Sequence, residues 1–535
     1  MLVVDHNGRA VVDPQVAATR PMGLPLAHLT RPPTEAISTE AIARAGDRPP
    51  QLDVPARPTL PTAGRRRRRS MGLAGSVAAV VALGSLAVLA PSRVPGLNGL
   101  LGRGPAASAA RPGDARIEIT QLLSRMQTAV RAGDTAGIAA LVDPADQALG
   151  ARWAALPARV RTVGASAVQF SLLPGPLPAL RTDPAPARFD RYVDVPVQFG
   201  YTLAGWDRSP VATVLALRFG RVGSAWRLVG DSAAAPAARP ITPSAATPME
   251  PWVTTEVAVA RTTHALVVGD PARRADNQRL AAELEQASRA VRAVLPSTRW
   301  NGQVVAYAST DPVIVASWFG GRAAREGRRA GNDPAAFAAE VRTLTGQGRS
   351  GTTSSAPVAA RLAVTPYLLT RRDSRSQAVL RHEITHVALA LEGQGAVPAW
   401  LVEGAAEFIA YRQLVAGRVS AVAALDRRGL PAPTWQQLQK RVWRPVLVTQ
   451  STTFYTGTNS QVARNYTDAW LTCLYIAQHY GEARLFQLYA AAATSPEQDP
   501  AVVEKAVLRS VLDVDQAELR RQVAAFARTL RTNFS

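Results

Sequence analysis

The chain has 535 residues, of which 47% are apolar, so it is long and apolar enough to bury cores in two to four folded units. Its net charge is +21, but five of these charges form the run Arg65–Arg69 and no basic motif interleaved with aromatic residues accompanies it, so we expect no nucleic-acid partner. The single cysteine, Cys473, excludes an intrachain disulfide and a zinc site built from several thiolates.

The first part of the chain has the composition of a tail, a hydrophobic span and a linker. Residues 1–69 are rich in Pro and Ala and lack periodicity, which predicts a disordered tail. Residues 70–91 are uncharged and long enough to cross a bilayer as one helix. The arginine run before them predicts a cytoplasmic tail and extracellular C-terminal domains, and hence a cell-membrane protein with one transmembrane helix. The alternative, a buried core helix, fits poorly with flanks of this composition, and residues 92–112 are a Gly/Pro/Ala-rich linker.

The next unit, residues 113–235, begins with helical patterns and continues with strands. An apolar stripe runs from Ile117 to Val130, and a short helix is expected from Thr135 to Val142. Four strand-like runs follow, at residues 163–172, 191–203, 211–219 and 226–229. Helices followed by a meander of long strands resemble the NTF2-like cone fold, which implies a small α+β domain. No catalytic set is visible in it, so we interpret it as a packing or binding module.

The last unit covers residues 253–535 and follows a second Pro/Ala-rich linker, residues 236–252. Its first elements are expected to be two strands, a long helix and two further strands, at residues 253–259, 264–268, 274–294, 303–308 and 361–365. Mostly helical sequence follows. The predicted fold class is therefore α+β: a transmembrane helix, a small NTF2-like domain, and a mainly helical C-terminal domain with a mixed sheet at its N-terminal end.

The segment from His382 to His386 contains the pattern H-E-x-x-H. No helix breaker occurs between Ala378 and Leu391, so the pattern is expected to lie on a helix. Residues four apart share one helix face, which allows both imidazoles to bind a single metal ion. Glu383 follows the first histidine, where its carboxylate can take a proton from an attacking water molecule.

A catalytic zinc ion needs a third protein ligand and one open position. The other four histidines lie before the predicted span or far along the chain, so a carboxylate is the better candidate. The segment P-A-W-L-V-E-G-A-A-E-F, residues 398–408, resembles the W-L-x-E-G-x-A-E segment of gluzincins, the thermolysin-like and aminopeptidase-like metallopeptidases. The resemblance implies Zn²⁺ held by His382, His386 and Glu403. It also implies that Glu407, one turn later, orients a ligating histidine.

The gluzincin pattern includes a later tyrosine or histidine that stabilises the oxyanion of the tetrahedral intermediate. Tyr466 resembles this residue in its placement, with Tyr455 as the second candidate, and a purely structural tyrosine is the alternative for either. The same resemblance implies that the strand at residues 361–365 is a sheet edge that binds an extended peptide. Gly404 is expected to let its helix approach the metal-binding helix closely.

Taken together, these motifs predict a membrane-anchored, extracytoplasmic zinc metallopeptidase that acts on a peptide or protein substrate, with Glu383 as general base. The alternative is a non-catalytic binding or scaffold protein of the cell envelope that is built on a zincin fold. The complete H-E-x-x-H pattern together with Glu403 favours the enzyme. No G-x-M-E-N motif occurs, and endopeptidase and aminopeptidase modes are not separated by the sequence.

Overall fold

A computed structural model of the chain describes residues 2–4, 10–12, 112–182, 189–231, 250–295, 299–311, 314–315, 317–318, 336–342, 357–370, 374–393, 395–416, 437–438 and 442–529. Two short strands, β1 (Leu2–Val4) and β2 (Ala10–Val12), pair with each other in antiparallel fashion. The rest of the predicted tail and nearly all of both predicted linkers lie outside the described residues.

The predicted fold class is wrong where it includes a transmembrane helix. Among the described residues, no helix combines the length with the apolar character that crossing a bilayer requires. A crossing helix needs about 20 predominantly apolar residues, whereas the long helix that follows the H-E-x-x-H motif carries Glu403, Glu407 and Arg412. The predicted span itself, residues 70–91, lies outside the described residues. The described fold is α+β without a spanning helix.

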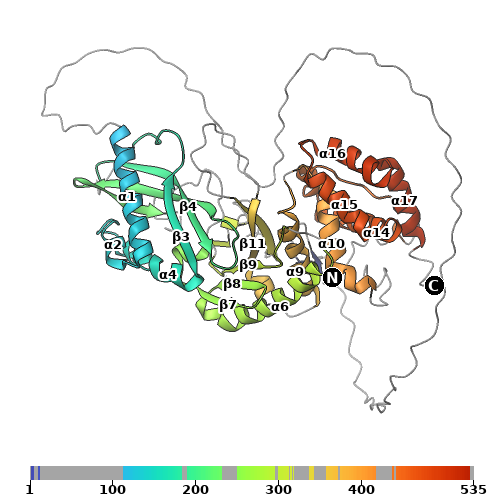
Figure 1. Cartoon of the computed structure of the whole chain (residues 1–535), viewed down its shortest axis with the longest axis horizontal. Helices are drawn as coiled ribbons and strands as arrows, with labels where there is room; N and C mark the ends of the chain where they lie inside the picture. The colour runs from blue at the N-terminus through green and yellow to red at the C-terminus, as the bar shows by residue number, and fades with distance from the viewer. Residues whose placement is uncertain are drawn as a thin grey trace, which may run out of the picture. The chain divides into compact units, whose positions relative to one another are not determined.

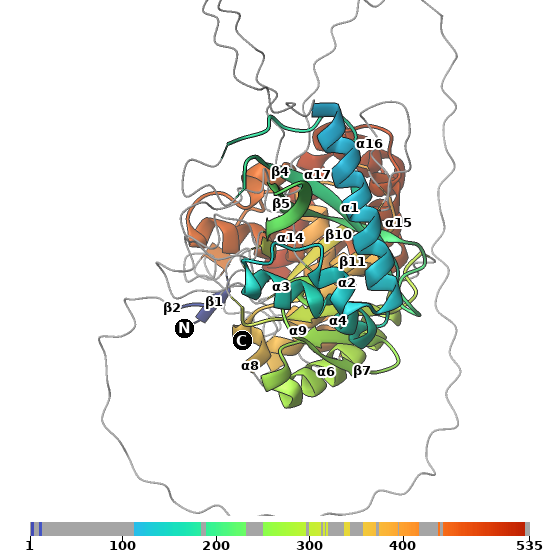
Figure 2. The ribbon, with the colours of Figure 1, turned by 90° about the vertical axis from the view of Figure 1, so that its left-hand side faces the viewer.

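Residues 112–231 form four helices packed on an antiparallel meander, and the first helix lies beside strand β3 (Figure 1). The four helices face the viewer in Figure 2. The helices are α1 (Pro112–Ala132), α2 (Thr135–Ala139), α3 (Gln147–Ala154) and α4 (Leu156–Val163). The strands are β3 (Ala165–Leu172), β4 (Tyr192–Leu203), β5 (Val211–Val222) and β6 (Ala225–Asp231). The predicted helical stripe and all four predicted strands are confirmed.

Helices α3 and α4 are absent from the sequence prediction, and each contains a residue that usually interrupts helices. Gly150 lies inside α3, but Asp146 begins that helix by accepting a hydrogen bond from the Leu149 backbone N–H at 3.0 Å. Pro157 lies in the first turn of α4, where a missing backbone N–H costs nothing.

A second group of strands forms a mixed sheet in the order β10, β11, β9, β8, β7. Strands β8 (Ala265–Gly269), β9 (Val304–Ala308) and β11 (Pro357–Val364) are parallel, and β7 (Ala258–Arg261) and β10 (Ala336–Arg342) pair antiparallel to their neighbours. Arg342 of β10 also pairs with Ala212 of β5, which joins the two groups into one nine-stranded sheet. The strand predicted at residues 253–259 is wrong in its first half, where Pro251 starts helix α5 (Pro251–Thr254).

Both faces of the parallel strands are buried. Ala306 and Leu362 belong to a core shared with the C-terminal helices, while Tyr307 and Ala363 belong to a core shared with residues 115–253. Because parallel strands covered on two sides carry nearly continuous apolar sequence, this arrangement explains why the strands are rich in Ala, Val and Leu. The part of the chain that contains the meander thus covers one face of the parallel strands, and the helix with the predicted metal motif lies on the other face.

A buried polar cluster crosses this second core, and we call Tyr201, Asp207, Glu250, Tyr307 and Arg361 the junction cluster. The Arg361 guanidinium lies 2.8 Å from the Asp207 carboxylate, and both side chains are about 1% exposed. The Tyr201 hydroxyl donates to Glu250 Oε1 at 2.5 Å and lies 3.3 Å from the Tyr307 hydroxyl. Burial raises the pKa of the Glu250 carboxyl above its ordinary value. The cluster links strand β4 and the loop after it to β9 and β11.

The remaining helices belong to the same part of the chain as the mixed sheet. They are α6 (Arg274–Arg292), α8 (Pro366–Thr370), α9 (Ser374–Leu389), α10 (Ala399–Ala416), α13 (Ser451–Phe454), α14 (Asn459–His479), α15 (Glu482–Ala493), α16 (Pro500–Val507) and α17 (Gln516–Thr529), with the 3₁₀-helix Pro271–Arg273 and the π-helix Leu508–Leu512. Helices α6 and α9 lie against strands of the mixed sheet. Helix α9 packs against α6 and α10, and α14 to α17 lie together (Figure 1). Thr458 and Gln461 start α14 with a capping box.

Candidate metal centre

Helix α9 carries the H-E-x-x-H motif and is held by its apolar face. Leu380, Ile384 and Ala388 are fully buried in the core with the sheet and the C-terminal helices. Their spacing of four residues defines one stripe of the helix. His382 and His386, also four residues apart, lie on another face, with side chains 12% and 19% exposed, and point toward α10.

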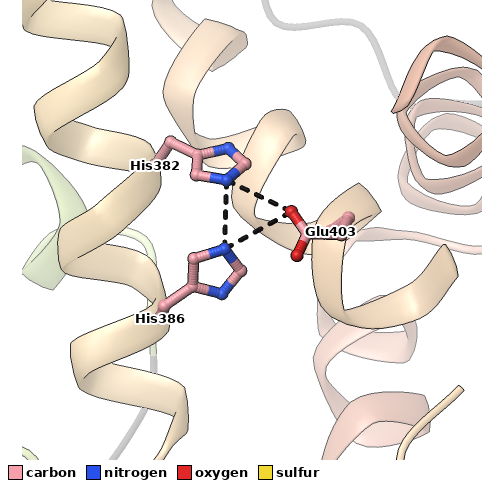
Figure 3. Close-up of side chains that lie close together, drawn as sticks. All are labelled: His382, His386 and Glu403. Atoms are coloured by element: carbon pink, nitrogen blue, oxygen red, sulfur yellow. Dashed lines mark hydrogen bonds and ion pairs between the residues drawn. The ribbon is translucent and has the colours of Figure 1, made fainter. Parts of the chain in front are cut away.

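Three side chains from these two helices converge on one point (Figure 3). His382 Nε2 and His386 Nε2 lie 3.0 Å apart. Glu403 Oε2 lies 3.3 Å from the first nitrogen and 3.5 Å from the second. The structure thus brings together the three residues that the sequence predicts as metal ligands.

The triangle of ligand atoms fits a small tetrahedral ion. Zinc bonds to nitrogen and oxygen of about 2.0–2.1 Å place the corners of a tetrahedron about 3.3 Å apart. Glu403 Oε2 is also buried without a hydrogen-bond partner, which is costly for a carboxylate oxygen unless something else satisfies it. Two imidazoles and one carboxylate are a donor set that zinc accepts in catalytic sites. The residues present therefore fit the ion that the motif implies.

The histidines and carboxylates of the candidate metal centre shift one another's pKa. Burial alone raises the pKa of the Glu403 carboxyl, but the nearby His386 and His382 outweigh it and hold that pKa below its ordinary value. Burial lowers the pKa of His382, whereas Glu403 and Glu407 raise it and prevail. The pocket therefore favours a positive charge beside the Glu403 carboxylate, and a cation could take that place.

Glu407 lies where the resemblance predicts it. Its Oε1 atom is 3.1 Å from Nδ1 of His382, the ring nitrogen that faces away from the convergence point. Ligating histidines usually present their second ring nitrogen to such an oxygen, which fixes the orientation of the ring. One turn of α10 separates Glu407 from Glu403, so the same helix supplies a ligand and the support for another.

Glu383 and the two candidate tyrosines surround the centre. Glu383 is 8% exposed. Burial and the charge of Glu403 raise the pKa of Tyr455 and of Tyr466, and the charge of Glu383 raises both further. The ring of Tyr466 lies 6.2 Å from that of His382, whereas the Tyr455 hydroxyl donates directly to Glu403 Oε1. Both phenols therefore stay protonated, and Tyr455 contacts Glu403 whereas Tyr466 lies beside His382.

The predicted peptide-binding edge at residues 361–365 is wrong. Strand β11 pairs with β10 on one side and with β9 on the other, so it has no free edge. The sequence could not reveal this, because β10 is separated from β11 by a Gly/Ser/Thr-rich stretch and its short run of alanines carries no clear strand pattern.

Gly404 makes a close helix contact, but with a different helix from the predicted one. A Cβ atom at this position would lie 2.6 Å from the Ala469 carbonyl oxygen and 2.6 Å from Cys473 Sγ, both on α14. The missing side chain therefore lets α10 approach α14 rather than α9. This contact holds α10 against α14 at the residue that follows Glu403.

We expect the substitution Gly404→Ala to lower the free energy of unfolding by about 1–3 kcal/mol, because the added methyl group overpacks a rigid contact. Gly150→Ala is the matched control, since a Cβ atom there meets nothing within 4 Å and alanine favours a helix by about 1 kcal/mol. Urea denaturation of both variants measures the difference. A Gly404→Ala protein as stable as the Gly150→Ala protein would contradict the contact.

Residues 442–455, which we call the strap, were not predicted from the sequence, apart from Tyr455 as a candidate oxyanion donor. They run beside the start of α10 and end at Tyr455. The buried carboxylates of Asp468 and Glu504 bind the strap, although neither residue belongs to a recognisable motif. The only usable signal is indirect: acidic residues within the apolar patterns of α14 and α16 indicate a buried polar contact.

Comparison with known proteins adds no relative: neither the models of protein families nor the curated proteins contain a match to this chain.

Proposed function

We propose that the chain is a zinc-dependent peptidase. The observation that carries the proposal is the triangle formed by His382 Nε2, His386 Nε2 and Glu403 Oε2, with Glu383 next to the first histidine on the same helix. Only three side chains among the described residues form this metal-binding group, which leaves a position for water or substrate. A structural zinc site would instead be closed by a fourth protein ligand.

In this proposal each residue has one task. His382, His386 and Glu403 hold the ion, and Glu407 orients His382. Zinc, when bound, supplies a positive charge that polarises the scissile carbonyl and makes water more acidic. Glu383 takes the proton of the attacking water and delivers it to the leaving amine.

Two further features support a peptide substrate. The Tyr466 ring lies 6.2 Å from that of His382, and its hydroxyl, kept protonated by its buried surroundings, is the kind of donor that stabilises the oxyanion formed during peptide hydrolysis. Strand β10 lies beside α9, and among the described residues its outer edge pairs with another strand only at Arg342. An extended peptide can add to such an edge through main-chain hydrogen bonds.

We expect the purified full chain to contain about one zinc ion and to cleave members of a peptide library. Treatment with a chelator should remove the ion and abolish cleavage, and added zinc should restore both. His386→Ala should lose the metal, because two ligands cannot hold it. His264→Ala is the control, since His264 pairs with Glu285 at 2.8 Å on the turn between β7 and β8.

Elemental analysis measures the zinc content, and mass spectrometry of the digest measures peptide cleavage. A chain that binds no zinc, or a His386→Ala variant that retains it, would contradict the metal site. Stoichiometric zinc with no cleavage of any library member would contradict the peptidase and favour the non-catalytic scaffold.

A further inference from the structure

The strap caps the start of helix α10. Backbone N–H groups in the first turn of a helix have no partner within the helix. In α10, the N–H of Ala399 donates to the Thr449 carbonyl at 2.8 Å, and that of Trp400 donates to the Val448 carbonyl at 3.1 Å. The strap is therefore fixed to the helix that carries Glu403.

Two buried carboxylates fix the strap to the neighbouring helices. Asp468 of α14 accepts hydrogen bonds from the Val446 N–H at 2.8 Å and from the Trp443 indole N–H at 3.0 Å. Glu504 of α16 accepts from the Thr449 hydroxyl at 2.6 Å and from the Trp400 indole N–H at 2.7 Å. The side chains of Asp468 and Glu504 are 0% and 4% exposed, so water does not compete for these bonds.

Tyr455 at the end of the strap contacts the third ligand. Its hydroxyl donates to Glu403 Oε1, which leaves Oε2 of the same carboxylate facing the two histidine nitrogens. The hydroxyl has one hydrogen, and that hydrogen is directed at a ligand rather than at an open position. Asn465 of α14 adds a bond from its side-chain N–H to the Phe454 carbonyl at 2.8 Å, directly before Tyr455.

We propose that Tyr455 is a positioning residue for the metal ligand: by occupying Oε1 of Glu403, it makes the carboxylate present Oε2 alone to the ion. The strap, held by Asp468 and Glu504, keeps the hydroxyl in place. This inference rests on the zinc site proposed above. It assigns to Tyr455 a task other than oxyanion stabilisation, which leaves Tyr466 as the donor for the substrate.

The test compares zinc affinity, by chelator competition, and the visible spectrum of the Co²⁺-loaded protein in the full chain and its variants. For Tyr455→Phe we expect zinc affinity to fall at least about tenfold and the Co²⁺ spectrum to change. Residues that support a metal ligand typically raise metal affinity by about 10–100-fold. Tyr475→Phe is the matched control, since that buried phenol donates to Gln522 at 3.1 Å, away from the proposed metal ligands. Tyr466→Phe should lower hydrolysis with zinc affinity unchanged.

The strap is tested separately with Thr449→Val and Thr449→Ser. The valine variant loses the bond to Glu504 and should shift zinc affinity in the same direction as Tyr455→Phe, and serine should restore it. Zinc affinity and Co²⁺ spectrum unchanged in Tyr455→Phe would overturn the inference even if hydrolysis falls, and would leave the proposed function intact. A parent chain that binds neither ion overturns both. A parent that binds zinc without hydrolysing peptides overturns only the proposed function, since the affinity comparison still applies.

Discussion

The Glu383→Gln variant should retain the parent's zinc content but hydrolyse peptides about 10²–10⁴-fold more slowly, the range that a positioned general base contributes. Glu383 neighbours His382 on α9, yet its carboxylate is not among the three groups that converge at the proposed metal position. Glutamine has nearly the same shape and keeps the packing of the helix, but it does not accept a proton from water. The measurement is kcat/KM on a peptide identified from the library, together with zinc content.

Two further variants make this result specific. Glu407→Gln should weaken zinc binding, because it removes the charge beside Nδ1 of His382. Glu256→Gln changes a carboxylate that is 70% exposed on the loop after α5 and should alter neither quantity. Equal turnover by the Glu383→Gln variant and the parent would rule out Glu383 as the base.

Removing the guanidinium of Arg361 should cost about 3–5 kcal/mol of unfolding free energy, because Arg361→Met leaves the Asp207 carboxylate charged and buried without its partner. The loss of stability arises mainly from the Asp207 carboxylate, which is left buried without an opposite charge. Changing Asp207 to Asn in the same chain should therefore recover part of it, since the amide oxygen can still accept the Leu203 N–H at this position. Equilibrium urea denaturation of the parent and of these two variants measures both effects.

The ion pair of Arg412 and Glu482 is the control for the junction cluster. Its side chains are each 38% exposed and their closest approach is 2.9 Å, so Arg412→Met should change stability by only about 0–1 kcal/mol. If Arg361→Met costs no more than this surface substitution, the junction cluster does not hold the two parts of the sheet together.

Local patterns were sufficient to predict the helix of the candidate metal centre and the three side chains that converge there. His382 and His386 depend only on the spacing of a single helix, and Glu403 lies in a short segment of recognisable sequence. The prediction failed where the partner is remote. Tyr455 and Glu403 are 52 positions apart, and Trp400 and Glu504 are 104 positions apart, so no window of sequence shows that they meet.

The same reason explains the two incorrect contacts. Gly404 indicates that another element packs closely against α10, but a glycine does not identify that element. The structure shows that it is α14. The strand at residues 361–365 was recognisable by its apolar run, yet whether a strand lies at an edge depends on the partner that pairs with it. Hydrophobic periodicity predicts elements, and pairing between elements is decided by the whole fold.

The junction cluster also has a consequence for the order in which the chain can fold. Asp207 and Arg361 are 154 positions apart, and Tyr201 and Tyr307 are 106 positions apart. During synthesis from the N-terminus, the meander is complete long before β9 and β11 leave the ribosome. The part of its buried face at Phe199 and Tyr201 stays exposed until Trp252 and the later strands are synthesised. Nascent chains that stop between residues 231 and 357 would therefore present an apolar face to chaperones and to one another.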